Sequence, residues 1–519
     1  MLGGKRAEPE PCVVVIFGAS GDLVQRKVGP AIYNLAREDR LPDNTAFVGY
    51  GRTEYTDESF REHMRESLPK FSRHDPREDN AWAALRDRFY YQQGSYDVEE
   101  DLRSLRQKVD TVDAERGVGG GRMHYLAIPP HLAGDVVGGL TEVGLLERRT
   151  QEQERESGAM RVVMEKPFGR DLESARELNQ MLEQHLEESQ IFRMDHYLGK
   201  ETVQNIMVLR FANAILEPVW NARYVRHIHV TVAEADGIGS RAGYFESAGA
   251  LRDVMQNHVL QLLALFTMEA PTSLESDAIR DEKAKVLRSL RRLEGEDLHC
   301  SLVRGQYGRG EIDGEAVRAY REEKGVDAES CTETFVALRT YIDNWRWSGV
   351  PFYLTTGKRL PRKLTEVAVE FREVPSVLFG NEQTGDLATN LLKIRVQPDE
   401  NVMLRLNTKI PGMELKTRAA EMNFPYGSVY GSDSPEAYER LVLDAMAGIA
   451  TLFTRRDEIE LAWDFVDPIL KYWQETQCPD FPNYRSGTWG PISGKDFFRE
   501  DTCYECAMKN REEHEEARS

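Results

Sequence analysis

The stretch CVVVIFGASGDL, residues 12–23, places an unbroken apolar run directly before a turn that contains two glycines. β-branched side chains dominate residues 12–17 and no polar residue interrupts them, which is typical of a strand buried on both faces. A stretch with helical character follows, from about Gln25 to Arg37. A buried strand that enters a glycine turn and then a helix predicts the first unit of a doubly wound α/β sheet.

The same alternation continues along the chain as far as Glu165. We expect further strands at 46–49, 123–128 and 162–165, and a helix at 57–68 for which Thr56 can serve as the N-cap. The glycine-rich segment 117–121 and the charged segment 147–157 are expected to form surface loops. Strands that alternate with helices predict a mostly parallel, Rossmann-like sheet.

Beyond about Tyr197 the pattern changes. One long apolar helix is expected at about 249–268, and alternating segments follow at 335–341, 352–355, 367–371, 392–396 and 402–406. Because turns rather than helices separate many of these segments, they favour a mainly antiparallel sheet. We therefore divide the chain into an N-terminal α/β dinucleotide-binding domain, residues 1–197, and a larger C-terminal α+β domain, residues 198–519.

The composition is that of a globular protein, with 519 residues, 40% of them hydrophobic and 30% charged. No run of 18 apolar residues is present and the first residues lack the apolar core of a secretory signal, so we expect a cytoplasmic protein without membrane spans. The formal net charge of −20 disfavours nucleic acid and anionic membranes as partners, although a local basic pocket can still bind a small anion.

Six cysteines are too few for a disulfide scaffold and are in keeping with a reducing compartment. Cys503 and Cys506 have the CxxC spacing, but no second CxxC or histidine pair completes a zinc site. We predict no metal.

The turn Gly18-Ala19-Ser20-Gly21-Asp22-Leu23 is suited to phosphate, because glycines let backbone N–H groups approach an anion at the start of a helix. It lacks the full GxGxxG pattern and can also be a plain strand–helix turn, but its place in the first βα unit favours a dinucleotide. Arg52 stands after the second strand, where NAD-binding folds carry an acid. A guanidinium there favours the 2′-phosphate of NADP, the alternative being an ordinary surface arginine.

Two later segments combine cationic and apolar residues. Lys166 follows the expected strand 162–165, at the sheet edge where open α/β folds bind ligands, and it can equally be a surface lysine. His196, Tyr197 and Lys200 surround a glycine and offer three donors to an anion.

A polar stripe marks the long apolar helix. Asp253, Asn257 and Gln261 recur at i, i+4 and i+8, and a buried polar stripe needs partners or a cavity. His258 lies beside this stripe. A lone histidine on such a helix is more often a satisfied core residue than a catalytic one.

Taken together, these segments resemble the glucose-6-phosphate dehydrogenase family. The resemblance spans residues 18 to 491 and is carried by GASGDLxxRK at 18–27, EKPFGRDL at 165–172, RMDHYLGKE at 193–201, RDVMQNH at 252–258, GVPFxLxxGKxL at 349–360, NTKIPG at 407–412 and YRSGTWGP at 484–491. The block RMDHYLGKE alone is highly specific. The chain departs from the family's usual pattern at Val24-Gln25, where Ala-Lys is common, which removes one positive charge near the phosphates.

The resemblance implies an enzyme that oxidises glucose 6-phosphate at C1 and transfers the hydride to NADP, giving 6-phosphoglucono-1,5-lactone and NADPH in the first step of the pentose phosphate pathway. It implies His258 as the general base and Asp195 as the carboxylate that orients it. The substrate would contact His196, Tyr197, Lys200, Glu234, Asp253, Lys358, Lys363 and Lys166. The cofactor would contact Gly18, Ala19, Ser20, Gly21, Asp22, Leu23, Lys27, Arg52, Tyr125 and Lys166.

The family also implies a homodimer or homotetramer. Two alternatives stay open from the residues alone: a dehydrogenase of another sugar phosphate, and a catalytically silent NADP-binding sensor. The presence of both Asp195 and His258 weighs against the sensor, because a binding module has no use for a base and its orienting carboxylate.

Overall fold

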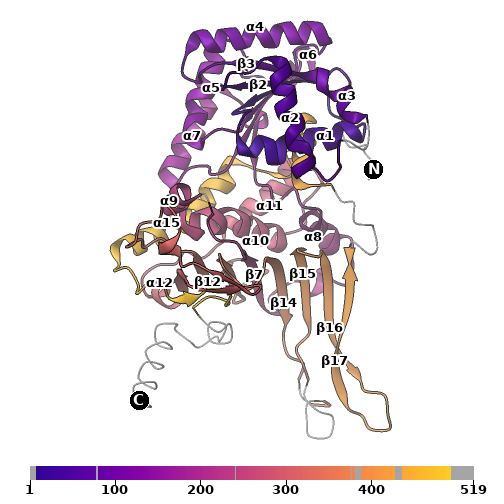
Figure 1. Ribbon diagram of the computed structural model, residues 1–519. Coiled ribbons are helices and arrows are strands. Elements are labelled where there is room, and N and C mark those ends of the chain that lie inside the picture. Colours follow the sequence, from indigo (N-terminus) through magenta and orange to yellow (C-terminus); the bar gives the residue numbers. More distant parts are fainter. Residues whose placement is uncertain are drawn as a thin grey trace. The chain divides into compact units, whose positions relative to one another are not determined.

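The computed structural model describes residues 8–76, 80–239, 241–375, 377–379, 387–426 and 435–491, and it divides into two compact units (Figure 1). Unit 1 comprises Met1–Glu201, Pro271–Asp281 and Pro435–Glu460, and unit 2 comprises Thr202–Ala270, Glu282–Ser434 and Leu461–Ser519. Neither unit is continuous in sequence. The expected pairing of an α/β domain with a larger, mainly antiparallel one is confirmed.

Unit 1 is built on a seven-stranded sheet with the order β18-β6-β5-β4-β1-β2-β3, in which only the short β18 is antiparallel to its neighbour. The strands are β1 (Val13–Phe17), β2 (Ala46–Gly51), β3 (Phe89–Gln93), β4 (Arg122–Leu126), β5 (Met160–Glu165), β6 (Ile191–Met194) and β18 (Phe453–Thr454). β1 is completely buried between β2 and β4, as its apolar run predicts.

Helices cover this sheet. They are η1 (Val24–Val28), α1 (Gly29–Arg37), α2 (Asp57–Phe71), α3 (Ala81–Leu85), α4 (Glu99–Arg116), α5 (Ala133–Glu142), α6 (Gln151–Ser157), α7 (Leu172–His185) and α14 (Ala437–Met446), with short 3₁₀ turns η2 (Arg86–Arg88), η3 (Pro130–Leu132) and η4 (Glu188–Gln190). Thr56 caps α2, because its hydroxyl accepts the N–H of Ser59 at 3.1 Å.

One expected loop is wrong. The charged segment 147–157 contains α6, which begins at a capping box in which Thr150 and Gln153 exchange hydrogen bonds. Glutamate, glutamine and arginine are good helix formers, so the segment's polarity did not exclude a helix.

Unit 2 is built on an eight-stranded sheet with the order β17-β16-β15-β14-β7-β13-β12-β8, antiparallel throughout except for the pair β7–β13. The strands are β7 (Val225–Ala233), β8 (Leu302–Gly305), β12 (Phe335–Tyr341), β13 (Pro351–Gly357), β14 (Leu364–Phe371), β15 (Leu391–Gln397), β16 (Asn401–Lys409) and β17 (Thr417–Pro425). Two small ribbons pair β10 (Gly310–Ile312) with β11 (Glu315–Val317), and β9 (Tyr307–Gly308) with β19 (Tyr484–Arg485).

The helices of unit 2 include α9 (Ala242–Ala250), η6 (Leu251–Val259), α10 (Leu260–Thr267), α12 (Glu296–Cys300) and the 3₁₀ turns η5 (Glu217–Val219) and η7 (Tyr320–Glu322). Three further helices, α8 (Glu201–Phe211), α11 (Ser276–Arg288) and α15 (Arg456–Glu475), contain the residues at which the chain passes between the units. Among the described residues, no helix is both long enough and apolar enough to cross a membrane.

The long helix expected at 249–268 differs from the structure at its start. Gly249 has a φ of +64°, so the helix begins only at Leu251, and its first nine residues form the π-helical segment η6 before α10 continues it. The side-chain pattern predicted a helix here but did not reveal its π-type hydrogen bonding.

The cysteines also differ from expectation. Cys331 and Cys478 form a disulfide with a Cα–Cα distance of 5.8 Å, although six scattered cysteines gave no sign of a bond. Cys12 is a buried free thiol. Cys503 and Cys506 lie outside the described residues.

Candidate functional site

The glycine turn after β1 has the geometry that a phosphate needs. Gly18 has a φ of +74°, and a Cβ there would overlap the carbonyl oxygen of Ala127. The Gly21 N–H donates to the Gly18 carbonyl at 2.8 Å, which closes a tight turn directly before η1. Only glycine fits position 18, and the turn leads into the N-terminus of the helical stretch, so the residues present are suited to a dinucleotide pyrophosphate.

The predicted cofactor residues around this turn lie largely at the surface. Arg52 follows β2 and is exposed, and the Ser20 hydroxyl is 2.9 Å from that of Thr53. Asp22 pairs with Arg26 at 2.6 Å, and Lys27 pairs with Glu436 at 3.0 Å. The structure therefore brings Ser20 and the Arg52 segment together, while the Lys27 ammonium is engaged with a carboxylate.

A half-buried carboxylate that the sequence analysis missed stands at the end of β5. The Glu165 side chain accepts a hydrogen bond from the Tyr125 hydroxyl at 2.6 Å and also interacts with Tyr438. Burial raises the pKa of Glu165, while these hydrogen bonds and Lys166 oppose the shift. Tyr125 is fully buried, so its clearest role in the structure is to hold this carboxylate beside half-buried Lys166.

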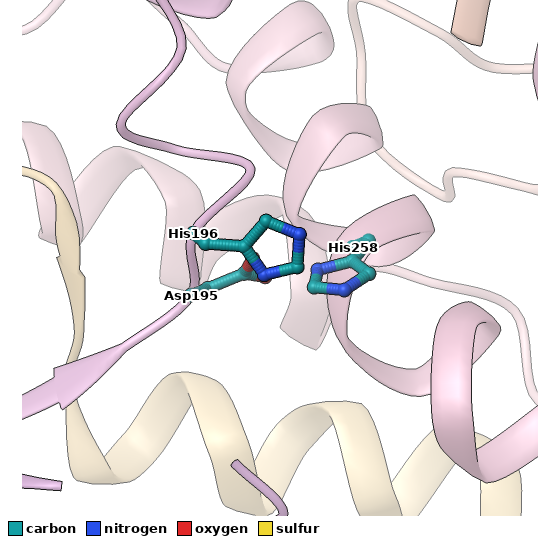
Figure 2. Close-up of side chains that lie close together, drawn as sticks. All are labelled: Asp195, His196 and His258. Atoms are coloured by element: carbon teal, nitrogen blue, oxygen red, sulfur yellow. The ribbon is translucent and has the colours of Figure 1, made fainter. Parts of the chain in front are cut away.

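The segment after β6 gathers the predicted anion-binding residues of unit 1. Asp195 is 2% exposed, and its Oδ1 accepts the backbone N–H of Tyr197 at 2.9 Å. The Lys200 ammonium lies 4.1 Å from the centre of the Tyr197 ring, and the half-buried His196 ring lies 4.9 Å from that ring, centre to centre. Asp195 and His196 are drawn at the end of β6 in Figure 2, together with His258 of the helix η6.

Unit 2 brings three predicted substrate residues together. Lys358, which follows β13, forms an ion pair with Glu234 at the end of β7, and its Nζ lies 3.9 Å from Asp253 Oδ2. The Lys358 side chain is only 3% exposed, so its charge depends on these two carboxylates. Lys363, in contrast, is exposed in the turn before β14, and no described contact joins it to this cluster.

Tyr244 is a further member of this cluster that the sequence analysis missed. Its hydroxyl donates to Asp253 Oδ1 at 3.3 Å. No signal for this contact was present in the sequence, because Tyr244 lies before the expected helix and the helical path is interrupted at Gly249, between Tyr244 and Asp253.

His258 lies in η6, and the π-helical geometry changes its position relative to Asp253. At 3.6 residues per turn a residue five positions on lies about 140° around the axis. A π-helix closes its hydrogen bonds between residues i and i+5, so His258 comes about one turn after Asp253 instead. The expected stripe of Asp253, Asn257 and Gln261 is thereby altered, because Asn257 turns its amide to the Arg252 carbonyl at 3.1 Å. His258 itself is 2% exposed.

Comparisons with known proteins agree over nearly the whole chain. The family model described as "Glucose-6-phosphate dehydrogenase, NAD binding domain" matches residues 15–205, and the model "Glucose-6-phosphate dehydrogenase, C-terminal domain" matches residues 207–505. A glucose-6-phosphate 1-dehydrogenase 2 of Mycobacterium bovis is 46% identical, with 94% of this chain and 93% of the relative covered. A glucose-6-phosphate 1-dehydrogenase of Chlamydia muridarum is 43% identical, with 95% and 96% covered.

Solved structures give the same result. A glucose-6-phosphate dehydrogenase in complex with its substrate glucose-6-phosphate superimposes with a TM-score of 0.86 at 36% identity, covering 95% of this chain and 98% of that one. A glucose-6-phosphate 1-dehydrogenase from Mycobacterium avium gives a TM-score of 0.77 at 35% identity, covering 93% and 96%.

Proposed function

The chain belongs to the glucose-6-phosphate dehydrogenase family, and on that premise we propose that it oxidises glucose 6-phosphate at C1 to 6-phosphoglucono-1,5-lactone, with NADP as the hydride acceptor. It is an oxidoreductase of carbohydrate metabolism, at the entry to the pentose phosphate pathway. The observation that carries the proposal is the π-helical segment η6, which presents buried His258 about one turn after Asp253. Asp253 lies beside Lys358, which also pairs with Glu234.

We assign His258 the role of general base. Oxidation of an alcohol at C1 requires loss of the hydroxyl proton as the hydride leaves, and a neutral imidazole near physiological pH can accept it. Asp195 is assigned to orient that imidazole and to stabilise its charged form. Asp195 is held in place by its own bond to the Tyr197 N–H, which supports a fixed carboxylate.

Phosphate and sugar are assigned to different residues. His196, Tyr197 and Lys200 supply an imidazole, a phenol and an ammonium for the dianionic 6-phosphate. Glu234, Asp253 and Lys358 supply acceptors and a donor for the sugar hydroxyls, and Lys363 extends this set from the surface. We assign Lys166 a position between the substrate and the cofactor.

When NADP is bound, its nicotinamide ring accepts the hydride. The turn Gly18–Leu23 would hold its pyrophosphate, and Arg52 would hold the 2′-phosphate, because the guanidinium is exposed and can form a bidentate pair with that anion. Ser20, Asp22, Lys27 and Tyr125 complete the cofactor assignment. In this arrangement the chain's own residues bind and orient both reactants, while one histidine moves the proton.

We also propose that the protein works in the cytoplasm as a homodimer or homotetramer. Its substrate and cofactor are phosphorylated anions that do not cross membranes unaided. The outermost strand β17 leaves Met422 and Phe424 exposed, at 62% and 41%, and an apolar edge strand of this kind favours association between copies. Light scattering of the purified protein tests this, and a monomer at all concentrations would contradict it.

The reaction itself is tested by following NADP reduction by the purified protein. Glucose 6-phosphate should support turnover, and unphosphorylated glucose should not. If the protein binds NADP but none of the sugar phosphates tested supports NADP reduction, the proposal is contradicted and the sensor is favoured.

A further inference from the structure

A buried carboxylate outside the proposed active residues stands at the start of the helix that carries them. Glu333 lies two residues before β12 and is 7% exposed. Its Oε1 accepts the N–H of Leu251, the first residue of η6, at 3.0 Å. Its backbone carbonyl accepts the N–H of Ala250, also at 3.0 Å. Side chain and backbone of Glu333 therefore both bind the first turn, where a helix has N–H groups without intrahelical partners.

Gly249 makes room for this carboxylate. A Cβ at position 249 would lie 2.6 Å from Glu333 Cδ, and the φ of +64° disfavours any residue with a side chain. The break between α9 and η6 is thus shaped around Glu333. Burial raises the pKa of Glu333, and its bond to Leu251 and the nearby Arg252 oppose that shift.

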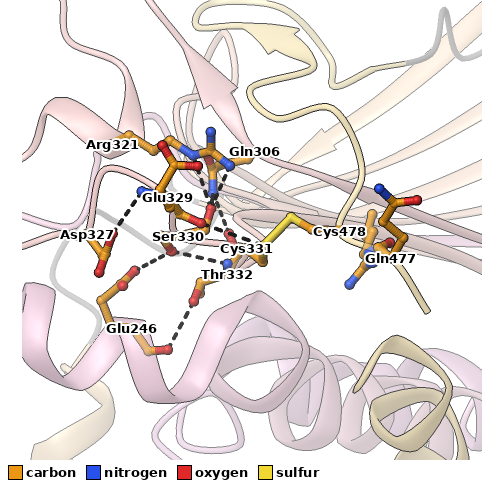
Figure 3. The surroundings of a disulfide bond; sticks show 11 residues. Glu246, Gln306, Arg321, Asp327, Glu329, Ser330, Cys331, Thr332, Gln477 and Cys478 are labelled. Carbon is orange, nitrogen blue, oxygen red and sulfur yellow. Dashed lines mark hydrogen bonds between the residues drawn. A yellow bond between two sulfur atoms is a disulfide. The ribbon is translucent and has the colours of Figure 1, made fainter. Parts of the chain in front are cut away.

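The segment that carries Glu333 is held in place by contacts of the residues before and after it. Ser330 Oγ donates to Glu246 Oε1 at 2.9 Å, and Thr332 Oγ1 donates to the Glu246 carbonyl at 3.0 Å, which ties the segment to α9 (Figure 3). Between them, Cys331 is covalently joined to Cys478. On the other side, the Thr334 carbonyl accepts the Lys358 N–H at 2.9 Å.

These contacts have a consequence for η6. The position of the first helical residue determines where each following side chain lies around the helix axis. In η6 that first residue, Leu251, is bound by the Glu333 carboxylate, and the segment that carries Glu333 is itself held by hydrogen bonds and a disulfide. Two residues after Leu251 comes Asp253, and five residues further comes His258. A shift of the first turn would move both side chains together.

We infer that Glu333 is a positioning residue for the reaction: by capping η6 at Leu251 and filling the space beside Gly249, it sets the register that places Asp253 and His258. This inference rests on the proposed function of those two residues. Glu333 itself takes no part in proton transfer.

The first test compares Glu333→Ala with Glu333→Gln. The glutamine side chain has the same shape as glutamate and keeps one acceptor oxygen, whereas alanine removes the cap. Because misplacement of a reacting group by about 1 Å can cost about 10²-fold in rate, we expect Glu333→Ala to lower kcat at least about tenfold. Glu333→Gln should restore most of this loss. The KM for glucose 6-phosphate should rise with the loss of kcat, since Asp253 moves too, while the KM for NADP should stay unchanged because its proposed ligands lie in unit 1.

Thr340→Val is the matched control. Thr340 lies in β12, is fully buried and donates to the Arg291 carbonyl at 3.3 Å, so its hydroxyl does not bind η6. It should lower the melting temperature without lowering kcat. If Glu333→Ala, although folded, behaves like Thr340→Val, with lower stability and normal kcat, Glu333 is structural only and the inference is overturned.

Gly249→Ala supplies an independent test of the same contact. The Cβ of the new alanine should displace the Glu333 carboxylate, so Gly249→Ala should lower kcat as Glu333→Ala does. The kcat of the double variant should be no lower than that of the less active single variant. If the losses in kcat of the two single variants add in the double variant, the two residues do not act through one contact and the inference is overturned. Wild-type turnover with glucose 6-phosphate and its loss in His258→Asn are measured alongside. If wild type is inactive or His258→Asn is fully active, the proposed function fails, and this outcome is distinct from an active wild type with an insensitive Glu333.

Discussion

The buried ion pair of Lys358 offers the most quantitative test of the substrate cluster. Lys358→Met keeps the length and apolar volume of the side chain but removes the ammonium that faces Glu234 and Asp253. Breaking a fully buried pair by removing one partner costs about 3–5 kcal/mol. The Glu234 side chain is 32% exposed and is partly solvated, whereas Asp253 is 9% exposed, so we expect a loss of about 2–3 kcal/mol in the free energy of unfolding.

Denaturant unfolding of wild type and Lys358→Met, followed by tryptophan fluorescence, measures this loss. Adding Glu234→Gln to Lys358→Met removes one of the two stranded charges and should recover part of the stability. Lys363→Met is the matched control, because that lysine is exposed and its loss should change stability by no more than about 0.5 kcal/mol. The reasoning is refuted if Lys358→Met is as stable as wild type, or if Lys363→Met is destabilised equally.

Three further predictions concern the base, the cofactor and the sheet. His258→Asn should lower kcat at least about 10²-fold while NADP still binds, because general base catalysis contributes that much; near-normal kcat would contradict the role. Arg52→Ala should raise the KM for NADP more than that for NAD, and equal changes would remove Arg52 from the 2′-phosphate. Burial lowers the pKa of His124 to about 3, from about 6.5 when unfolded, so the unfolded state binds the proton first and stability falls as the pH drops below about 6.5. Between pH 7 and pH 5 this histidine should cost about 2 kcal/mol, and His124→Leu should lose correspondingly less stability over that range; an identical pH profile for both proteins would be the contrary result.

The sequence predicted four strands of the sheet of unit 1, because these strands are short apolar runs next to glycine and proline turns, whereas β3 and β6 were not predicted. β1, β2, β4 and β5 all lie where those runs predicted them. β18 could not be found in this way. It is only two residues long, and it joins the sheet through Phe453 and Thr454, which are far from β6 in the sequence.

In unit 2 the strands of the large sheet with clear alternation were predicted, and β7, β8 and β17 were missed. β7 carries a usable signal in the alternation of Ile228, Val230 and Val232, all fully buried. β17 has no such signal, because nearly all of its residues are exposed and it is held mainly by backbone pairing to β16.

The candidate site was predictable where the motif is local. Asp195, His196, Tyr197 and Lys200 fall within one turn, and their closeness follows from the sequence. Contacts between distant segments were not predictable, such as Tyr438 with Glu165, or Glu333 with Leu251. The π-helical form of η6 was hidden for a related reason, since side-chain spacing does not report which backbone groups are bonded.

The central claim is that His258 and its neighbours oxidise a phosphorylated sugar with NADP. The most direct measurement is the initial rate of NADP reduction with glucose 6-phosphate, compared with unphosphorylated glucose and with NAD, for wild type and His258→Asn. We predict rapid reduction only by wild type, only with the phosphorylated sugar, and mainly with NADP. Folded wild-type protein that binds NADP but shows no reduction in any combination would contradict it.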